Sequence, residues 1–389
     1  MTTTIHETTI ELSARFAGVR DELRSLLVQV EDSATADREL AWVGSALAQW
    51  GDASAQIAGR APIGSVAVLT PSTLPVYSAL LFAGGAALPG NRVTLRPSGR
   101  AGTAAGAFVE QVLVPSGLEI ELTQQRGREL VRAAATGDAL VFTGSPENAD
   151  AIAAGLPEDV VMAYQGPGVC AAVVGPTADV AQAVDTVVAD RLFNVGQDCM
   201  SIERLYVHTS RADEVLAGLR ARAGRLRVSE RLAGAGDLFP LQAPEAYRGR
   251  LLTGMAEATE VHVPGDERAD GVFGLAVMTC EADSATVLRE AYGPLLPVVI
   301  YSDDGELKEM LELGDFALGL EVFGDLPKFG VLDFAHVTVN RSLYDEESFL
   351  MPFGGYRRTS FVRGEGRRTA GPHWLPWIVS APGSGRDRL

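Results

Sequence analysis

Short apolar runs alternate with longer helical stretches along the chain, and this alternation constrains the fold more than any other feature. "GSVAVLT", "RVTLR" and "ALVFTGS" are strand-sized, and each precedes a helical stretch: "PVYSALLFAGGAA", "GTAAGAFVEQVLV" and "PENADAIAAGL". After about residue 165 the alternation resumes with "CAAVV", a helix over 177–192, "RLYVHT" and a helix over 211–226, and later with "LPVVIYS" and "HVTVN". Strands separated by helices of about ten to fifteen residues are typical of βαβ units in parallel sheets.

Two series of such units predict an α/β protein of two lobes. The boundary is expected near residue 166, and a cleft between lobes is where a small-molecule site usually lies. Before residue 60, apolar residues at helical spacing predict a helix over 8–31 and a second helix through about residue 58. We expect this helical segment to pack on the first lobe.

The composition disfavours several classes of function. Asp and Glu total 50 against 33 Lys and Arg, and the net charge of -17 argues against nucleic acid and anionic membranes as partners. The apolar runs are too short to span a bilayer, and the start carries no export signal. Three widely spaced cysteines indicate a reducing compartment, which predicts a cytoplasmic protein. The five histidines are scattered away from the cysteines, so no metal site is expected.

One cysteine stands in a polar turn. Cys199 follows Gln197 and Asp198 in "FNVGQDCMSIERLYV", directly before an apolar strand. A reactive cysteine needs a polar, partly exposed setting that favours its thiolate, whereas Cys170 and Cys280 have apolar neighbours. Most buried cysteines are inert, so this stretch alone still favours a structural role for Cys199.

Two other stretches are candidates for binding cofactor phosphates. In "ALVFTGSPENADAIAAGL" a strand ends at Gly144, Ser145 can cap a helix, and Pro146 suits its first position. Such a helix start attracts a phosphate, although an ordinary turn is the more common interpretation. The strand "RVTLR" ends on Arg96, and Arg100 lies four positions on; basic groups there can hold a ribose or its 2′-phosphate, although this stretch alone favours a solvated face. "GPGVCA" matches a dinucleotide fingerprint, but a strand follows it where a helix is required, so we reject that interpretation.

Seven blocks taken together resemble the aldehyde dehydrogenase superfamily. They are "APIGSVAVLTPSTLP", "RVTLRPS", "LVFTGSPE", "FNVGQDCMSIERLYV", "EAYGPLLPVVIY", "VTVN" and "MPFGGYRRTS", in the order of that family. The resemblance implies a Rossmann-like cofactor lobe and a catalytic lobe, with the active site in the cleft between them. It divides the chain into a helical segment 1–60, an NAD(P)-binding lobe 61–165, a catalytic lobe 166–355 and a tail 356–389 that supplies an oligomerisation strand.

The resemblance also implies a role for individual residues. Cys199 takes the place of the nucleophile that forms a thiohemiacetal or thioester with the substrate. Glu290 and Tyr292 match residues that hold the nicotinamide ribose and ring. The other cofactor contacts implied in this way are Thr70, Arg96, Ser98, Gly99, Gly144 and Ser145. The acidic residue that holds the ribose hydroxyls in the family falls at Gly99, so we favour NADP over NAD as the cofactor.

The sequence departs from the family in three ways. An ungapped count from Cys199 places Gln165 where hydrolytic members have the glutamate that activates water, and an amide cannot take up that proton. Thr73 stands where the family has an oxyanion-hole asparagine. The front of the chain is also shorter than is usual. "AYQGPGVCAAVV" instead resembles the acylating branch, which exchanges its acyl group with a thiol.

The resulting hypothesis is an NAD(P)-linked oxidoreductase that reduces an activated acyl group, a thioester or an acyl phosphate, to an aldehyde. Its partners would be a small aldehyde or an acyl thioester on coenzyme A or a carrier protein, and further copies of the chain in a homodimer or larger homo-oligomer. Three alternatives stay open. They are ordinary aldehyde oxidation to an acid, a non-catalytic binding or scaffold subunit, and a cysteine acyltransferase or hydrolase that uses no nicotinamide.

Overall fold

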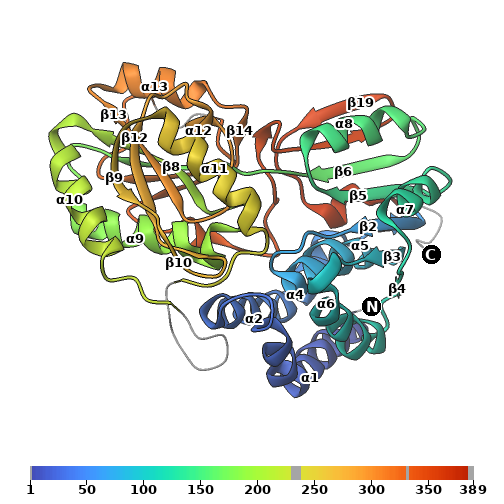
Figure 1. The fold of residues 1–389 in the computed structure, drawn as a ribbon. Coiled ribbons are helices and arrows are strands. Elements are labelled where there is room, and N and C mark those ends of the chain that lie inside the picture. The colour runs from blue at the N-terminus through green and yellow to red at the C-terminus, as the bar shows by residue number, and fades with distance from the viewer. Residues whose placement is uncertain (1, 229–237, 330–332, 384–389) are drawn as a thin grey trace. The chain divides into compact units, whose positions relative to one another are not determined.

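The computed structural model describes residues 2–228, 238–329 and 333–383, and these form two compact units (Figure 1). The first unit comprises Met1–Gly166, Glu347–Gly354 and Ser360–Leu389. The second comprises Pro167–Glu346 and Gly355–Thr359. Residues 347–354 therefore belong to the first unit in the structure, whereas the sequence analysis assigned them to the catalytic lobe.

The first unit is built on a seven-stranded sheet with the strand order β19-β18-β6-β5-β2-β3-β4. Its strands are β2 (Ser65–Leu69), β3 (Arg92–Arg96), β4 (Ile120–Leu122), β5 (Ala139–Thr143), β6 (Val161–Gln165), β18 (Ser360–Gly364) and β19 (Arg367–Ala370). The strands from β4 to β6 are parallel, and the late hairpin β18–β19 adds to β6 in antiparallel fashion. A separate antiparallel pair joins β1 (Arg60–Pro62) to β20 (Ser380–Pro382). The tail 356–389, predicted to supply an oligomerisation strand, thus pairs through β18 and β20 with strands of its own chain.

Helices cover both faces of this sheet. They are α1 (Thr2–Leu27), α2 (Ser33–Ala48), α3 (Trp50–Gln56), α4 (Pro75–Ser78), α5 (Gly85–Ala87), α6 (Gly102–Phe108), α7 (Gly127–Ala134), α8 (Pro146–Gly155) and α14 (Leu375–Ile378). Val66 and Val68 of β2 pack against the helices from α1 to α6, whereas Ala67 and Leu69 pack towards α7 and α8 (Figure 1). Because both faces are buried, the strands read as continuous apolar runs.

The second unit contains a seven-stranded sheet in the order β16-β15-β7-β8-β13-β12-β9. The strands are β7 (Cys170–Val174), β8 (Ile202–His208), β9 (Ala258–Pro264), β12 (Ala276–Cys280), β13 (Leu295–Tyr301), β15 (Gly319–Phe323) and β16 (His336–Val339). All neighbours are parallel except β9, which is antiparallel to β12. Two short antiparallel pairs complete the unit: β10 (Glu267–Ala269) with β11 (Val272–Phe273), and β14 (Phe316–Ala317) with β17 (Tyr356–Arg357).

The helices of the second unit alternate with these strands as the sequence predicts. They are α9 (Val180–Leu192), α10 (Ala212–Ala223), α11 (Pro244–Glu257), α12 (Ala285–Leu288) and α13 (Asp304–Glu312). The strands predicted at "CAAVV", "RLYVHT", "LPVVIYS" and "HVTVN" are confirmed as β7, β8, β13 and β16. In the described part of the chain, no helix combines the length and the apolar character that a membrane crossing requires.

Candidate active site

Four candidate residues of the first unit lie at the carboxyl edge of its sheet. The register pairs Leu69 with Arg96 and Thr143 with Gln165, so the residues after neighbouring parallel strands meet at one edge. The Thr70 N–H donates to the Arg96 carbonyl at 3.4 Å, and the Gly144 N–H donates to the Gln165 carbonyl at 3.1 Å. Open α/β sheets bind ligands at this edge, where the order of the strands reverses.

The turn after β5 has the form expected of a phosphate site. Ser145 caps α8 by accepting the Asn148 N–H at 3.3 Å, and Pro146 is the first residue of the helix. A Cβ atom on Gly144 would lie 2.7 Å from the Phe142 ring, so only glycine fits there. The helix dipole favours an anion at this point.

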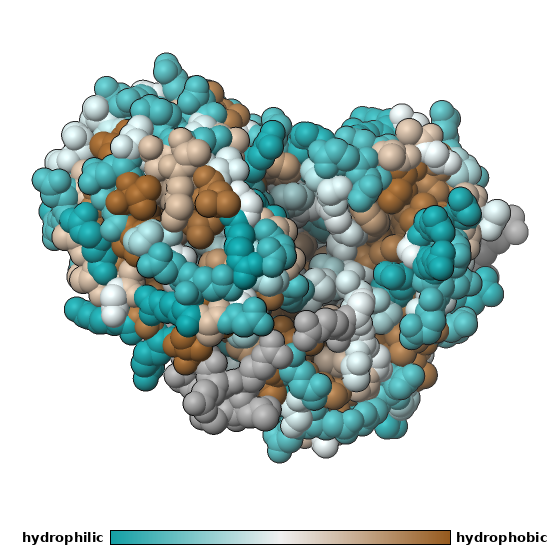
Figure 2. Space-filling model, viewed as in Figure 1, coloured by the Kyte–Doolittle hydropathy of each residue, from teal (hydrophilic) through white to brown (hydrophobic). Residues whose placement is uncertain are grey.

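Next to this turn lies a cavity of about 630 Å³ between α7 and α8. Leu69, Phe142 and Ile152 form its apolar lining, and the exposed Arg128 and Arg132 stand on its rim. Figure 2 shows hydrophobic residues reaching the surface in the region where Figure 1 places α7 and α8. An apolar pocket with basic groups beside a helix start fits the adenosine half of a phosphorylated dinucleotide. No motif in the sequence marks this pocket, because its lining comes from β2, β5, α7 and α8 together.

The residues after β3 leave room for a charged ribose substituent. The Arg96 Nε atom donates to the Gln125 carbonyl at 2.9 Å, which fixes the guanidinium. Ser98 directly precedes the short turn that starts at Gly99. A Cβ atom on Gly99 would meet no atom within 4 Å. The Arg100 side chain, predicted to flank Gly99, lies outside the described part of the structure.

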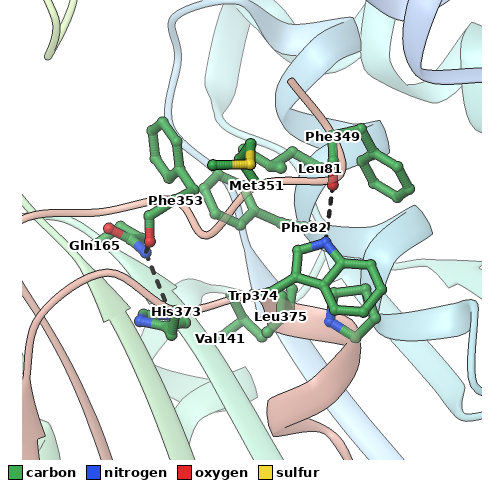
Figure 3. Close-up of a pocket in the computed structure, with 11 residues that line it drawn as sticks. Leu81, Phe82, Val141, Gln165, Phe349, Met351, Phe353, His373, Trp374 and Leu375 are labelled. Atoms are coloured by element: carbon green, nitrogen blue, oxygen red, sulfur yellow. Dashed lines mark hydrogen bonds between the residues drawn. The ribbon is translucent and has the colours of Figure 1, made fainter. Parts of the chain in front are cut away.

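Gln165 is held by its amide nitrogen (Figure 3). Its Nε2 atom donates to the Phe353 carbonyl at 3.1 Å and lies 3.3 Å from the His373 Nε2 atom. Because the His373 Nδ1 atom faces the Gly371 carbonyl at 3.4 Å, we assign the proton to Nδ1, which leaves Nε2 as the acceptor for Gln165. Burial lowers the pKa of His373 to about 4, so the ring is neutral at physiological pH. Gln165 thus donates to both partners.

Thr73, the predicted oxyanion contact, is buried directly before the helix that begins at Pro75. Its main-chain carbonyl accepts the Ser78 hydroxyl at 3.1 Å. Leu74, the next residue, has a φ of 46°, in the left-handed region that side chains rarely adopt. The strained turn fixes where Thr73 sits, and its role as an oxyanion donor stays a prediction.

Cys199 lies in the second unit, in the turn between α9 and β8, and it is half-buried. A Cβ atom on Gly168 would fall 1.8 Å from the Cys199 carbonyl oxygen, so the chain before β7 touches the turn that carries Cys199. Cys170 and Cys280 are buried. Burial raises the pKa of Cys280 to about 11 and that of Cys170 well above its ordinary value, so neither forms a thiolate readily.

The two acids near Cys199 in sequence are engaged elsewhere. The Asp198 carboxylate accepts the Met200 N–H and the Tyr344 hydroxyl, both at 2.9 Å. Glu203 is ion-paired with Arg191 at 2.9 Å, and the side chains of both are fully buried. Burial raises the pKa of Asp198, and the hydrogen bonds from Met200 and Tyr344 oppose that rise.

Glu290 and Tyr292 lie in the turn before β13, the strand beside β8. Glu290 lines a cavity of about 330 Å³ together with Arg250, Thr253 and Arg289. Burial, reinforced by the Glu203 carboxylate, raises the pKa of Glu290 to about 8. A carboxyl group that keeps its proton can donate a hydrogen bond to a ribose oxygen as well as accept one. The second unit thus gathers Gly168, Cys199 and Glu290 before three neighbouring strands.

Comparison with known proteins identifies the family of this chain. The model of the aldehyde dehydrogenase family matches residues 4–374. A glutarate-semialdehyde dehydrogenase of Pseudomonas aeruginosa is 26% identical over 380 residues, which cover 88% of this chain and 78% of that protein. A 4,4'-diapolycopene aldehyde oxidase of Methylomonas is 27% identical over 354 residues, which cover 82% and 66%. The chain spans about two thirds of the length of several curated relatives that it matches.

Solved structures share the fold at low sequence identity. An aldehyde dehydrogenase from Bacillus cereus superposes with a TM-score of 0.86 at 19% identity, over 98% of this chain and 83% of that one. An NADP-dependent glyceraldehyde-3-phosphate dehydrogenase from Bacillus halodurans, solved with NADP, gives a TM-score of 0.83 at 18% identity, over 97% and 85%. These likenesses confirm the predicted fold class.

Proposed function

Because this chain belongs to the aldehyde dehydrogenase family, we propose that it is an NADP(H)-linked oxidoreductase that acts through Cys199. The reaction that we favour is the reduction of an activated acyl group, a thioester or an acyl phosphate, to an aldehyde. In this scheme the Cys199 thiolate attacks the acyl carbon, the bond to the carrier thiol or phosphate breaks, and an enzyme thioester forms. The released thiolate or phosphate takes up the proton that the Cys199 thiol lost when it ionised.

The cofactor would supply the chemistry that the side chains cannot. When bound, NADPH would supply the hydride that converts an enzyme thioester to an aldehyde, and the Cys199 sulfur would take up one proton as the aldehyde leaves. The residues of the first unit that would hold it are Gly144 and Ser145 at the start of α8, with the adenosine half in the cavity between α7 and α8. In the second unit, Glu290 and Tyr292 would hold the nicotinamide ribose and ring.

The observation that supports acyl transfer over hydrolysis is the bonding of Gln165. Its amide nitrogen donates to Phe353 and to His373, so this position offers a hydrogen-bond donor where hydrolysis requires a base. Asp198 and Glu203, the other candidate acids, are each bonded to partners within the second unit. A thiol nucleophile brings its own reactivity and needs no activated water.

Ordinary aldehyde oxidation is the second candidate, because relatives of this chain are named dehydrogenases or oxidases of free aldehydes. The preference for NADP is supported by the open space around Gly99, where a carboxylate would repel a 2′-phosphate, and by a solved neighbour that carries NADP.

Two assays on the full chain separate these candidates. The first follows NADPH consumption with an acyl-coenzyme A thioester, and the second follows NADP reduction with an aldehyde in the presence and absence of coenzyme A. We expect turnover in the first assay and a strict thiol requirement in the second, both lost in Cys199→Ala. Rapid formation of free acid from aldehyde without a thiol would show that the acyl-reductase proposal is wrong and favour ordinary oxidation. A protein that binds NADPH but turns over in neither assay would be a non-catalytic member.

A further inference from the structure

One buried guanidinium connects the turn before Cys199 to the turn before β13. Arg191, the next-to-last residue of α9, has a completely buried side chain. Its Nη1 atom donates to the Ile202 carbonyl at 2.8 Å. Its Nη2 atom donates to the Gly196 carbonyl at 3.1 Å and also to the Gly293 carbonyl. Arg191 therefore bonds to both ends of the segment that carries Cys199 and to the turn that carries Glu290 and Tyr292.

Glu203 completes the connection from β8. Its carboxylate lies 2.9 Å from the Arg191 guanidinium and is buried with it. The same carboxylate accepts the Ala291 N–H at 2.8 Å and the Tyr292 N–H at 3.3 Å. The ion pair thus bonds to the turn before β13 from two sides, once through a carbonyl and once through two N–H groups. Charge-assisted bonds of this kind are stronger than those between neutral groups.

Both turns contain backbone that would not keep its shape without such support. Asn194 and Val195 have φ values of 46° and 51°, and Tyr292 has a φ of 49°. Left-handed backbone is costly for these residues, above all for the β-branched valine, and persists only where the surroundings fix it. A Cβ atom on Gly196 would lie 2.4 Å from Arg191 Nη2 and 2.7 Å from the Gly293 carbonyl oxygen, so the two turns and the guanidinium are in direct contact.

We propose that the Arg191–Glu203 ion pair is a positioning element that holds the Cys199 turn and the Glu290–Tyr292 turn in one fixed relation. Neither residue acts on the substrate; each acts through the backbone that it binds. The catalytic consequence rests on the proposed function, in which one turn carries the nucleophile and the other holds the nicotinamide ribose. A misplacement of about 1 Å between such groups lowers turnover about 10²-fold.

The test must remove the hydrogen bonds of Arg191 and Glu203 without leaving either charge buried and unpaired. Loss of one partner leaves the other charge buried and unpaired, whereas replacement of both by apolar residues is often tolerated. The variant to make is therefore Arg191→Met combined with Glu203→Leu, and Arg191→Lys serves as the conservative second variant. Tyr301→Phe is the matched control, because it deletes a buried hydrogen bond of the same unit, to the Val174 carbonyl at 3.4 Å.

Hydrogen exchange of the amides in residues 193–199 and 290–293 gives the first measurement, and NADPH-dependent acyl reduction gives the second. We expect the double variant to exchange at least about tenfold faster in both turns. We also expect kcat to fall about 10²-fold with the acyl-thioester KM changed less than about threefold. Arg191→Lys should fall between the parent and the double variant, and Tyr301→Phe should match the parent.

The two measurements keep this proposal separate from the proposed function. Parental exchange in either turn of a folded variant overturns the positioning role, and so does faster exchange with unchanged kcat. If the double variant does not fold, the same comparison is made on Arg191→Lys, where parental exchange and kcat overturn the proposal. If the parent reduces no acyl thioester, the exchange of the two turns still decides the positioning role, and only the proposed function fails.

Discussion

The two sheets present their candidate site residues at opposite ends of their parallel strands. In the first unit, Thr70 follows β2 and Gly144 follows β5, at the carboxyl edge. In the second unit, Gly168, Cys199 and Tyr292 precede β7, β8 and β13, at the amino edge. The same βα alternation thus produces two sites of different kinds.

The two sites differ in the sequence distance between each turn and the residues that hold its conformation. At the carboxyl edge, the turn after β5 is shaped by its own residues. Ser145 caps α8, and Gly144 has no Cβ atom that would collide with the Phe142 ring. At the amino edge, the turns are strained and are fixed by Arg191 and Glu203, which bond to the distant residues 291–293. Local sequence determines the turn after β5, whereas distant contacts hold the turns at the amino edge.

The largest effect is expected at the amino edge of the second unit. Cys199→Ser should lower acyl reduction by at least about 10⁴-fold, because a hydroxyl without a base is a weak nucleophile. Cys280→Ser is the control and should retain parental turnover, since burial raises the pKa of the Cys280 thiol to about 11. Brief iodoacetamide labelling followed by mass spectrometry should modify Cys199 before either other cysteine. Preferential labelling of Cys170 or Cys280 would contradict the assignment of the nucleophile.

The next effect concerns the buried histidine of the first unit. The folded state keeps His373 neutral down to a pKa of about 4, whereas the unfolded chain protonates it near 6.5. The unfolded state therefore binds more protons in this window, and stability should fall by about 3 kcal/mol as the pH is lowered from 6.5 to 4. Denaturant titrations of the parent and of His373→Gln should show a smaller decline in the variant. The same replacement at His208, in the second unit, is the control, and equal declines in parent and His373→Gln would refute the prediction.

A third test adds a base to the carboxyl edge. In Gln165→Glu, a carboxylate replaces the amide that donates to the Phe353 carbonyl and to His373, so its pKa should be raised. Hydrolysis of the acyl enzyme should therefore increase about 10²-fold, and only as the pH rises through that pKa. Single-turnover release of acid is the measurement, and Gln165→Met is the control. Equal release by both variants at alkaline pH would mean that position 165 is a packing site.

The smallest effect is expected on cofactor preference at Gly99, where a Cβ atom would meet no other atom within 4 Å. Gly99→Asp should weaken NADPH binding about tenfold relative to NADH, through repulsion of the 2′-phosphate. Gly99→Asn has nearly the same shape without the charge and should leave the ratio unchanged. Calorimetric titration of the parent and both variants with NADPH and with NADH measures the ratio of the two affinities. A parent that clearly prefers NADH would contradict the cofactor assignment.

Much of the fold could be predicted from the sequence, because the buried strands are short apolar runs between helices and the period is easy to recognise. The phosphate turn was also accessible, since capping and helix-start chemistry at Ser145 and Pro146 are local. The bonding of Gln165 was not accessible, because Phe353 and His373 reach it only through the tertiary fold. Nor was the role of Glu203, which the structure places in an ion pair with Arg191.

The strand that completes the first sheet is synthesised late. β6 ends at Gln165, but its partner β18 and the acceptors at Phe353 and His373 come after residues 167–346, the main segment of the second unit. On the ribosome, the nascent chain therefore carries an unpaired β6 edge while the second unit emerges and folds. Domains that fold during translation usually do so in order from the amino terminus, and an open strand edge is a site for aggregation. The first unit, begun first, is thus finished last, and its Gln165 amide gains its partners only then.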